Sequence, residues 1–233
     1  MAILGIVGGI APPSTVAYYR ACLEAYRRET GRSLRVVIDS VDSQAYFALL
    51  ERNDLVAIRR VLLEELSRLR DAGAAIAIVG SNTGHIQFDE LVASSPLPLV
   101  GIVDPVAEAL GERRRAGLFA TSFTVRNDVY QSALARRGIT CLVPPDEDQA
   151  RIQAIYFGEL VDGIFRDESR TELLGIAERL RAAQGVEAII LGGTELPLLL
   201  TESEVDGLAF VDSGRLHAEA AVRRLIELEV TGA

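Results

Sequence analysis

Two short stretches of the chain combine hydroxyl, imidazole, carboxylate and glycine groups in a spacing that could support proton transfer. The first is residues 81–85, Ser-Asn-Thr-Gly-His, in which Ser81 and His85 lie four positions apart and could share one face of a helical turn. The second is residues 192–195, Gly-Gly-Thr-Glu. A serine close to a histidine is typical of nucleophilic or acid–base chemistry. The alternative is that His85 only bonds the backbone of its own turn.

Each stretch directly follows a short apolar run. Residues 74–79 (Ala-Ala-Ile-Ala-Ile-Val) and 186–191 (Val-Glu-Ala-Ile-Ile-Leu) show no polar alternation, as expected of parallel strands covered on both faces. In open α/β sheets, ligands bind just beyond the carboxyl ends of the strands. We therefore expect both polar stretches to lie at strand ends where a ligand could bind.

Strands and helices are expected to alternate along the whole chain. Expected strands cover residues 2–7, 34–39, 74–79, 97–100, 116–120, 139–142, 186–191 and 207–212. Expected helices cover residues 14–30, 45–72 with a break near Asn53-Asp54, a segment containing Phe88 and Leu91, 104–115, 127–137, 149–165, 169–184 and 215–229. The order of elements begins again at residue 116, which indicates an internal duplication.

This pattern predicts an α/β fold with two pseudo-symmetric lobes, each a doubly wound parallel sheet flanked by helices, with a ligand cleft between the lobes. The expected N-terminal lobe is residues 1–100 plus 206–233, and the expected C-terminal lobe is residues 101–205.

Composition and charge exclude several classes of function. The net charge of −9 and the scattered arginines argue against a nucleic-acid partner. No apolar run reaches the roughly 18 residues of a membrane span, and no basic leader precedes the first strand, so we expect a cytoplasmic protein with no membrane partner. The chain contains no lysine, which excludes a pyridoxal phosphate Schiff base. His, Cys, Asp and Glu do not cluster at metal-ligand spacing, so no metal site is expected.

Several motifs together resemble one known family. Residues 3–9 (Ile-Leu-Gly-Ile-Val-Gly-Gly), residues 81–85, residues 191–197 (Leu-Gly-Gly-Thr-Glu-Leu-Pro) and residues 211–220 occur in the order and spacing of the aspartate/glutamate racemase superfamily. The chain is most similar to its aspartate racemase branch, and the resemblance covers nearly the whole length. It implies a cofactor-independent enzyme that acts on a small amino acid or dicarboxylate, and a homodimer.

The chain departs from the family where the family's two cysteines perform the chemistry. The family motifs read Cys-Asn-Thr-Ala-His and Leu-Gly-Cys-Thr-Glu-Leu-Pro, and here Ser81 and Gly193 stand at the two cysteine positions. A serine hydroxyl has a far higher pKa than a thiol, and glycine carries no proton to transfer. Cys22 and Cys141 match neither position and are expected to pack as small apolar side chains. Two-thiol racemisation is therefore not supported.

Three functions remain open. The chain could be an isomerase-like or lyase-like enzyme with altered catalytic groups, a noncatalytic protein that binds small carboxylates, or an inactivated racemase variant. If it is catalytic, the candidates are Ser81, His85, and Glu195 and His217 on the second side. By resemblance and by the amides and hydroxyls at the turns, the candidate substrate-binding residues are Gly8, Gly9, Gln44, Arg52, Asn82, Thr83, Thr121, Thr124, Arg166, Gly193 and Thr194. The Gly8-Gly9 pair lacks the G-x-G-x-x-G spacing of a dinucleotide site.

Overall fold

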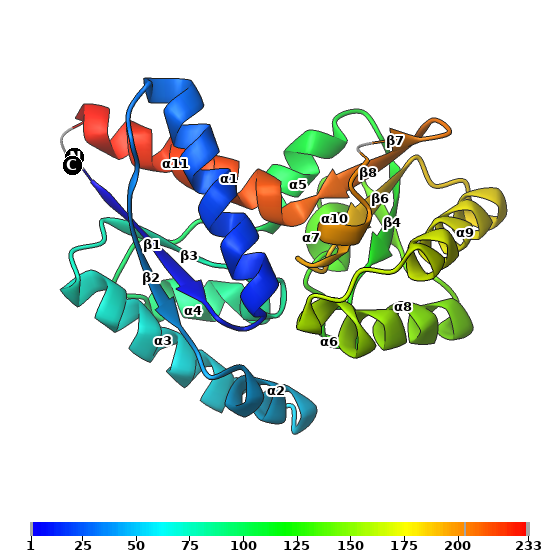
Figure 1. Ribbon diagram of the computed structural model, residues 1–233, viewed down its shortest axis with the longest axis horizontal. Helices are drawn as coiled ribbons and strands as arrows, with labels where there is room; N and C mark the ends of the chain where they lie inside the picture. The colour runs from blue at the N-terminus through cyan, green and yellow to red at the C-terminus, as the bar shows by residue number, and fades with distance from the viewer. Residues whose placement is uncertain (1, 203, 232–233) are drawn as a thin grey trace. The chain divides into compact units, whose positions relative to one another are not determined.

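The chain folds into two compact units, each with its own sheet. The computed structural model describes residues 2–202 and 204–231 (Figure 1). The first unit comprises Met1–Gly101 and Arg215–Ala233, and the second comprises Ile102–Gly214.

The first unit contains a three-stranded parallel sheet in which β1 lies between β2 and β3. Its elements are β1 (Ile3–Gly8), α1 (Pro12–Thr30), β2 (Arg35–Ser40), α2 (Ser43–Glu51), α3 (Leu55–Asp71), β3 (Ile76–Val79), the 3₁₀ turn η1 (Thr83–His85), α4 (Phe88–Ser94) and, from the C-terminal end of the chain, α11 (Ser213–Thr231). Helix α1 begins with Pro12 and Pro13, which suit a first turn, and Gly31 ends it with a φ of 69°.

The second unit contains a five-stranded sheet in the order β5-β4-β6-β8-β7. Its elements are α5 (Val103–Leu110), β4 (Arg115–Phe119), α6 (Ser122–Arg126), α7 (Gln131–Ala135), β5 (Thr140–Leu142), α8 (Asp146–Gly158), η2 (Leu160–Asp162), α9 (Asp167–Gln184), β6 (Ala188–Leu191), α10 (Leu196–Leu199), β7 (Glu204–Val205) and β8 (Leu208–Asp212). All neighbouring strands are parallel except β7, which pairs antiparallel with β8.

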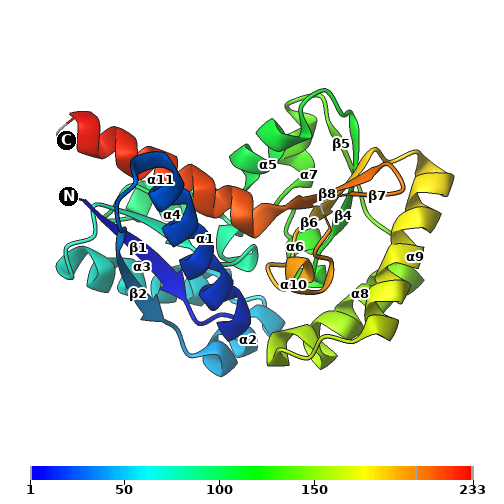
Figure 2. The same ribbon diagram turned by 45° about the horizontal axis from the view of Figure 1, so that its top comes forward.

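Helices cover both faces of each sheet (Figures 1 and 2). In the first unit, α1 and α11 pack with β1 and β3 around the buried side chains of Tyr18, Cys22 and Tyr26. In the second unit, α8 and α9 pack with β4 and β6 around Phe119, Tyr156 and other buried residues. Burial on both faces explains why β3 and β6 are apolar throughout.

The structure confirms the predicted α/β fold with parallel sheets flanked by helices. In both units the first strand lies between the second and the third, which agrees with the expected internal duplication. The break in the tract 45–72 is also present, because Asn53 has a φ of 52° and Asp54 caps α3 through its side chain.

Two predicted elements are wrong, and one strand was not predicted. Residues 97–100 form only an isolated bridge between Leu99 and Ala77. The helix expected at residues 127–137 is reduced to the short helix α7 (Gln131–Ala135), because Asp128 adopts a φ of 53° that a helix cannot contain. Strand β7 was not expected, and it adds an antiparallel edge to the second sheet.

Candidate functional site

The turn after β3 holds four of the candidate residues in buried positions. Ser81, Asn82, Thr83 and His85 are all at most 7% exposed. The Ser81 Oγ and Thr83 Oγ1 atoms lie 3.0 Å apart, so the two hydroxyls form a hydrogen bond. The expected helix start is only the single 3₁₀ turn η1, because Gln87 adopts a φ of 55° before α4. Individual amides and hydroxyls, rather than a long helix dipole, are therefore what this turn can offer a carboxylate.

His85 bonds the backbone of Ser81 and not its hydroxyl. Its Nδ1 lies 2.9 Å from the Ser81 carbonyl oxygen, and a carbonyl only accepts, so Nδ1 carries the proton. Burial lowers the pKa of His85 to about 4, although the carbonyls of Ser81 and Val100 favour its charged form. The ring is therefore neutral at pH 7. Its Nε2 atom has no well-aligned hydrogen-bond partner among the described residues.

His217 lies in the first unit beside His85. Its Nε2 donates to the Val100 carbonyl at 2.8 Å, and its Nδ1 accepts from the Tyr18 hydroxyl at 3.0 Å. The two imidazole rings meet edge to face with centroids 5.1 Å apart. Burial, together with the charge that His85 would carry, lowers the pKa of His217 to about 3. Both ring nitrogens are thus engaged, so His217 positions α11 on the rest of the unit.

The Gly8-Gly9 turn is filled by its own neighbours. The Gly9 amide donates to Thr15 Oγ1 at 2.9 Å, and the Gly8 carbonyl accepts from the Val41 amide at 3.0 Å. A Cβ atom on Gly9 would lie 2.7 Å from the Val41 carbonyl oxygen, and Gly9 has a φ of 81°. Both glycines are thus required for packing and turn geometry.

In the second unit, the turn after β4 carries Thr121 and Thr124. Both are at most 4% exposed, and Thr121 caps α6 while its hydroxyl lies 3.3 Å from that of Thr124. Two glutamines from α8 hold this turn. Gln149 donates to the Ala120 carbonyl at 2.8 Å, and Gln153 accepts from the Ser122 amide at 2.9 Å. These glutamines were not recognised in the sequence, although their spacing of four places them on one face of α8.

The turn after β6 centres on Glu195, which is fully buried. Its Oε2 accepts hydrogen bonds from the Tyr156 hydroxyl, which comes from α8, and from Thr194 Oγ1 at 3.1 Å. Burial and the Glu195 charge raise the pKa of Tyr156 well above its ordinary value, so the phenol stays protonated. Tyr156 was also missed in the sequence, because nothing in its local pattern distinguishes it from a core aromatic residue.

Gly193 has no room for a side chain. A Cβ atom there would lie 2.5 Å from Cε2 of Tyr156 and 3.3 Å from Cδ1 of Leu196. Gly193 is not among the residues with positive φ in the described chain. The Tyr156 ring, and not the backbone conformation, therefore makes glycine necessary at this position.

The remaining candidates lie at the surface or in the core. Gln44 is exposed on α2, Arg52 is exposed at its C-terminal end, and Arg166 is exposed ahead of α9, with its guanidinium 3.9 Å from Glu159. Burial raises the pKa of both Cys22 and Cys141 to about 12. Neither thiol is therefore a ready nucleophile.

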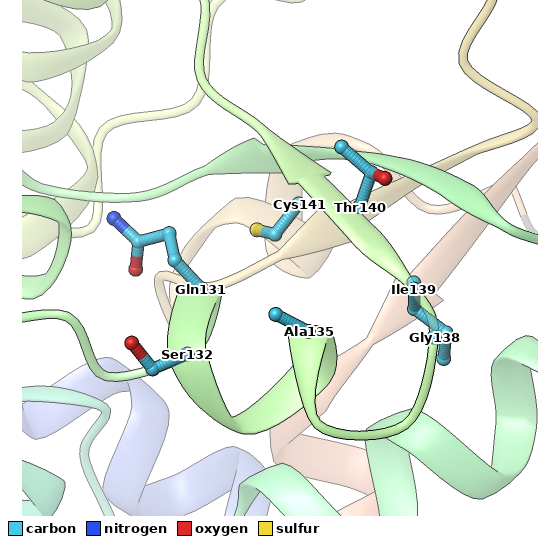
Figure 3. Close-up of a pocket in the computed structure, with 7 residues that line it drawn as sticks. All are labelled: Gln131, Ser132, Ala135, Gly138, Ile139, Thr140 and Cys141. Carbon is cyan, nitrogen blue, oxygen red and sulfur yellow. The ribbon is translucent and has the colours of Figure 1, made fainter.

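A pocket of about 460 Å³ opens beside the edge strand β5, away from the strand-end turns of its unit. Figure 3 shows the Cys141 sulfur pointing from β5 toward Gln131 and Ala135 of α7. The Ser132 amide donates to the Asp128 carboxylate, and Gln131 donates to the Val125 carbonyl at 2.8 Å, so the polar groups here serve the local fold.

Within residues 2–202 and 204–231, no group of three or more His, Cys, Asp or Glu could hold a metal ion. No helix in the same part of the chain is long and apolar enough to cross a membrane.

A family profile described as Asp/Glu/Hydantoin racemase matches residues 7–221. The chain belongs to the Asp/Glu/Hydantoin racemase family. A candidate Asp/Glu racemase from Yersinia pestis has 30% sequence identity and a TM-score of 0.85, and the alignment covers 97% of this chain and 100% of that one. An aspartate racemase homologue from Pyrococcus horikoshii OT3 also has 30% identity, with a TM-score of 0.80 over 99% of this chain and 100% of that one.

More distantly similar solved structures share the fold. A glutamate racemase from Francisella tularensis, crystallised in complex with D-glutamate, has a TM-score of 0.66 at 13% identity, over 98% of this chain and 82% of that one. The chain spans 52% to 63% of the length of the curated glutamate racemases it matches. Membership of this family supports a racemase-type isomerase.

Proposed function

We propose that the chain is a cofactor-independent enzyme of the racemase family that transfers a proton at the α-carbon of a small amino acid or dicarboxylate without using a thiol. The proposal rests on the cluster at the end of β6, where a buried carboxylate, Glu195, accepts hydrogen bonds from the hydroxyls of Tyr156 and Thr194. Buried carboxylates that are fixed by hydrogen bonds at a strand end are well placed for acid–base chemistry.

The strand-end hydroxyls support a carboxylate ligand. We propose that Thr121, Thr124 and Thr194, which are buried at the turns after β4 and β6 of the second unit, contribute hydrogen bonds to the ligand's α-carboxylate. Asn82 and Thr83, buried at the turn after β3, remain the substrate-binding candidates of the first unit. The D-glutamate complex of the Francisella enzyme supports this class of ligand. The exposed Gln44, Arg52 and Arg166 remain our candidates for a second carboxylate.

The chemistry that we favour uses one face of the substrate. Ser81 bonds Thr83, and His85 is turned to the Ser81 carbonyl, so the first unit offers no activated base of the Ser-His kind. Reactions that need a proton at one face only, such as a lyase, decarboxylase or cyclising step, therefore fit better than two-sided racemisation.

The test is α-proton exchange in deuterated water. The protein is incubated separately with the L and D forms of aspartate and glutamate, and the α-proton signal is followed by NMR. We expect deuterium to enter one enantiomer at an enzymatic rate with little inversion. Rapid conversion of either enantiomer into its mirror image would contradict the one-sided mechanism, and a complete absence of exchange would contradict the enzyme proposal.

A noncatalytic carboxylate-binding protein is the second candidate, because both thiol positions of the family are replaced. The same ligands distinguish it in a melting experiment, since a ligand at 100 times its Kd stabilises the native state by about 2.7 kcal/mol. Saturable stabilisation without exchange would favour the binding protein.

We extend the proposal to a cytoplasmic homodimer, as the resemblance implies. Sedimentation equilibrium over a range of protein concentrations tests the assembly. A single species at 25.2 kDa, the mass of one chain, would contradict it.

A further inference from the structure

The position of Tyr156 beside Gly193 suggests a specific role for its hydroxyl. Cε2 of Tyr156 is the ring atom that abuts the missing Cβ of Gly193, and it is bonded to the carbon that bears the hydroxyl. The phenol group therefore lies where a side chain at position 193 would otherwise extend from the end of β6. Helix α8 brings this hydroxyl to the turn, and Glu195 fixes its direction.

Glu195 and Tyr156 differ in their access to a ligand. Glu195 is 0% exposed, whereas Tyr156 and Thr194 each retain 7% of their surface. A carboxylate with no exposed surface cannot itself touch a substrate, but it can take a proton through a group that does. The Tyr156 hydroxyl is our candidate for such a group, because it donates to Glu195 Oε2 and its ring lies against Gly193 in the turn after β6.

We propose that Tyr156 and Glu195 form a proton relay in which Tyr156 contacts the substrate and Glu195 receives the proton. This inference rests on the function proposed above. In the forward step, the α-carbon–hydrogen bond breaks and its electron pair remains on the substrate, delocalised into the carboxylate. The released proton binds the Tyr156 oxygen as the phenol's own proton passes to Glu195 Oε2. In the reverse step, Tyr156 returns a proton to the same face and regains one from Glu195, so the phenol is neutral before and after.

This arrangement assigns separate roles to the two residues. Tyr156 is the catalytic residue, because it touches the reacting atoms. Glu195 acts through Tyr156 and is a positioning residue and proton acceptor. Gly193 also belongs to the proposed relay, because any larger residue at this position would displace the Tyr156 ring.

The test compares Tyr156→Phe, Glu195→Gln and the double variant with the wild-type protein in the deuterium exchange assay. Phenylalanine keeps the ring, and glutamine keeps an oxygen that can accept the Tyr156 hydrogen bond while losing the basic carboxylate. We expect each single variant to lower kcat by at least about 100-fold, the scale of general acid–base catalysis, with KM nearly unchanged. The double variant should be no slower than either single one, because the two residues act as a unit.

The matched control is Tyr26→Phe. Tyr26 is a buried tyrosine as well, and its hydroxyl donates to a glutamate, Glu229, at 2.8 Å, but this pair lies between α1 and α11. It should lose stability like Tyr156→Phe while keeping the wild-type exchange rate. Melting curves confirm that each variant is folded. Should Tyr156→Phe not fold, Gly193→Ala serves instead, since it displaces the ring without removing the hydroxyl and should also lower kcat.

The outcomes separate the two proposals. Exchange by the wild-type protein that persists in Tyr156→Phe would overturn the relay and leave the proposed function intact. A larger loss in the double variant than in either single one would also overturn the relay. Lack of exchange in the wild-type protein would overturn both proposals.

Discussion

At the scale of single residues, the Ser81 and His85 turn shows why spacing alone does not define chemistry. The four-residue separation does bring the two residues together, but the contact is with the Ser81 carbonyl, and the hydroxyl bonds Thr83. Sequence spacing predicts which residues approach each other and not which of their atoms meet. The importance of Tyr156 was likewise hidden, because its partners Gly193 and Glu195 lie about forty positions further along the chain.

Replacing Gly193 with cysteine should destabilise the protein. The new Cβ would lie 2.5 Å from the Tyr156 ring, and overpacking of this kind costs about 1–3 kcal/mol. Ser81→Cys is the control, because it replaces one heavy atom without adding another, and its cost should be the weakened hydrogen bond to Thr83, about 0.5–1.5 kcal/mol. Urea unfolding measures both. Equal stabilities of the two variants would show that the Tyr156 ring moves freely.

The two buried histidines should make stability fall in acid. The folded pKa values of about 4 for His85 and about 3 for His217 lie below the ordinary histidine value of 6.5. The unfolded chain therefore binds more protons than the native one between these values. The histidine contribution is complete above pH 6.5 and is lost as pH falls toward 4 and 3, with a slope of up to about 1.4 kcal/mol per pH unit for each histidine.

Urea unfolding of the wild-type protein and of His217→Gln between pH 7.5 and pH 4.5 measures this effect. We expect a shallower pH dependence in the variant, whatever its absolute stability. If the free energy of unfolding depends on pH equally in both proteins, groups other than His217 cause the loss of stability in acid.

At the scale of elements, the two units carry a buried tyrosine at corresponding places. Helices α2 and α8 each follow the second strand of their sheet, and each carries a buried tyrosine, Tyr46 and Tyr156. Burial raises the pKa of Tyr46. The side chain of Thr83, which follows β3, partly offsets this rise. The elements were predictable because apolar runs and helical periods are local signals. The failure at residues 127–137 arose where a single backbone conformation, that of Asp128, decides the outcome, which periodicity does not show.

The N-terminus of α3 tests one local sequence signal, the aspartate that caps a helix. Asp54 Oδ1 accepts from the Ala57 amide at 3.0 Å and so caps α3. Asp54→Ala should lower the free energy of unfolding by about 1 kcal/mol, whereas Asp54→Asn should cost little, because asparagine caps nearly as well. A pair of thermal melts checks this, and equal losses in both variants would point to the charge rather than the cap.

At the scale of the whole molecule, the chain has only two cysteines, and both lie outside the strand-end turns. Burial raises the pKa of each to about 12, so little thiolate forms at neutral pH. Native protein should therefore react slowly with a thiol reagent at pH 7.5 and rapidly once unfolded. Alkylation should not abolish α-proton exchange. Fast modification coupled to loss of exchange would return the chemistry to a thiol.

The close approach of Tyr156 to Gly193 also constrains how this lineage can change. A cysteine at position 193 is disfavoured while the tyrosine remains, and loss of the tyrosine first would leave Glu195 without its phenol donor. Either order passes through a less stable protein, so the substitutions are epistatic. We therefore expect Gly193→Cys to be tolerated better together with a smaller residue at position 156 than alone.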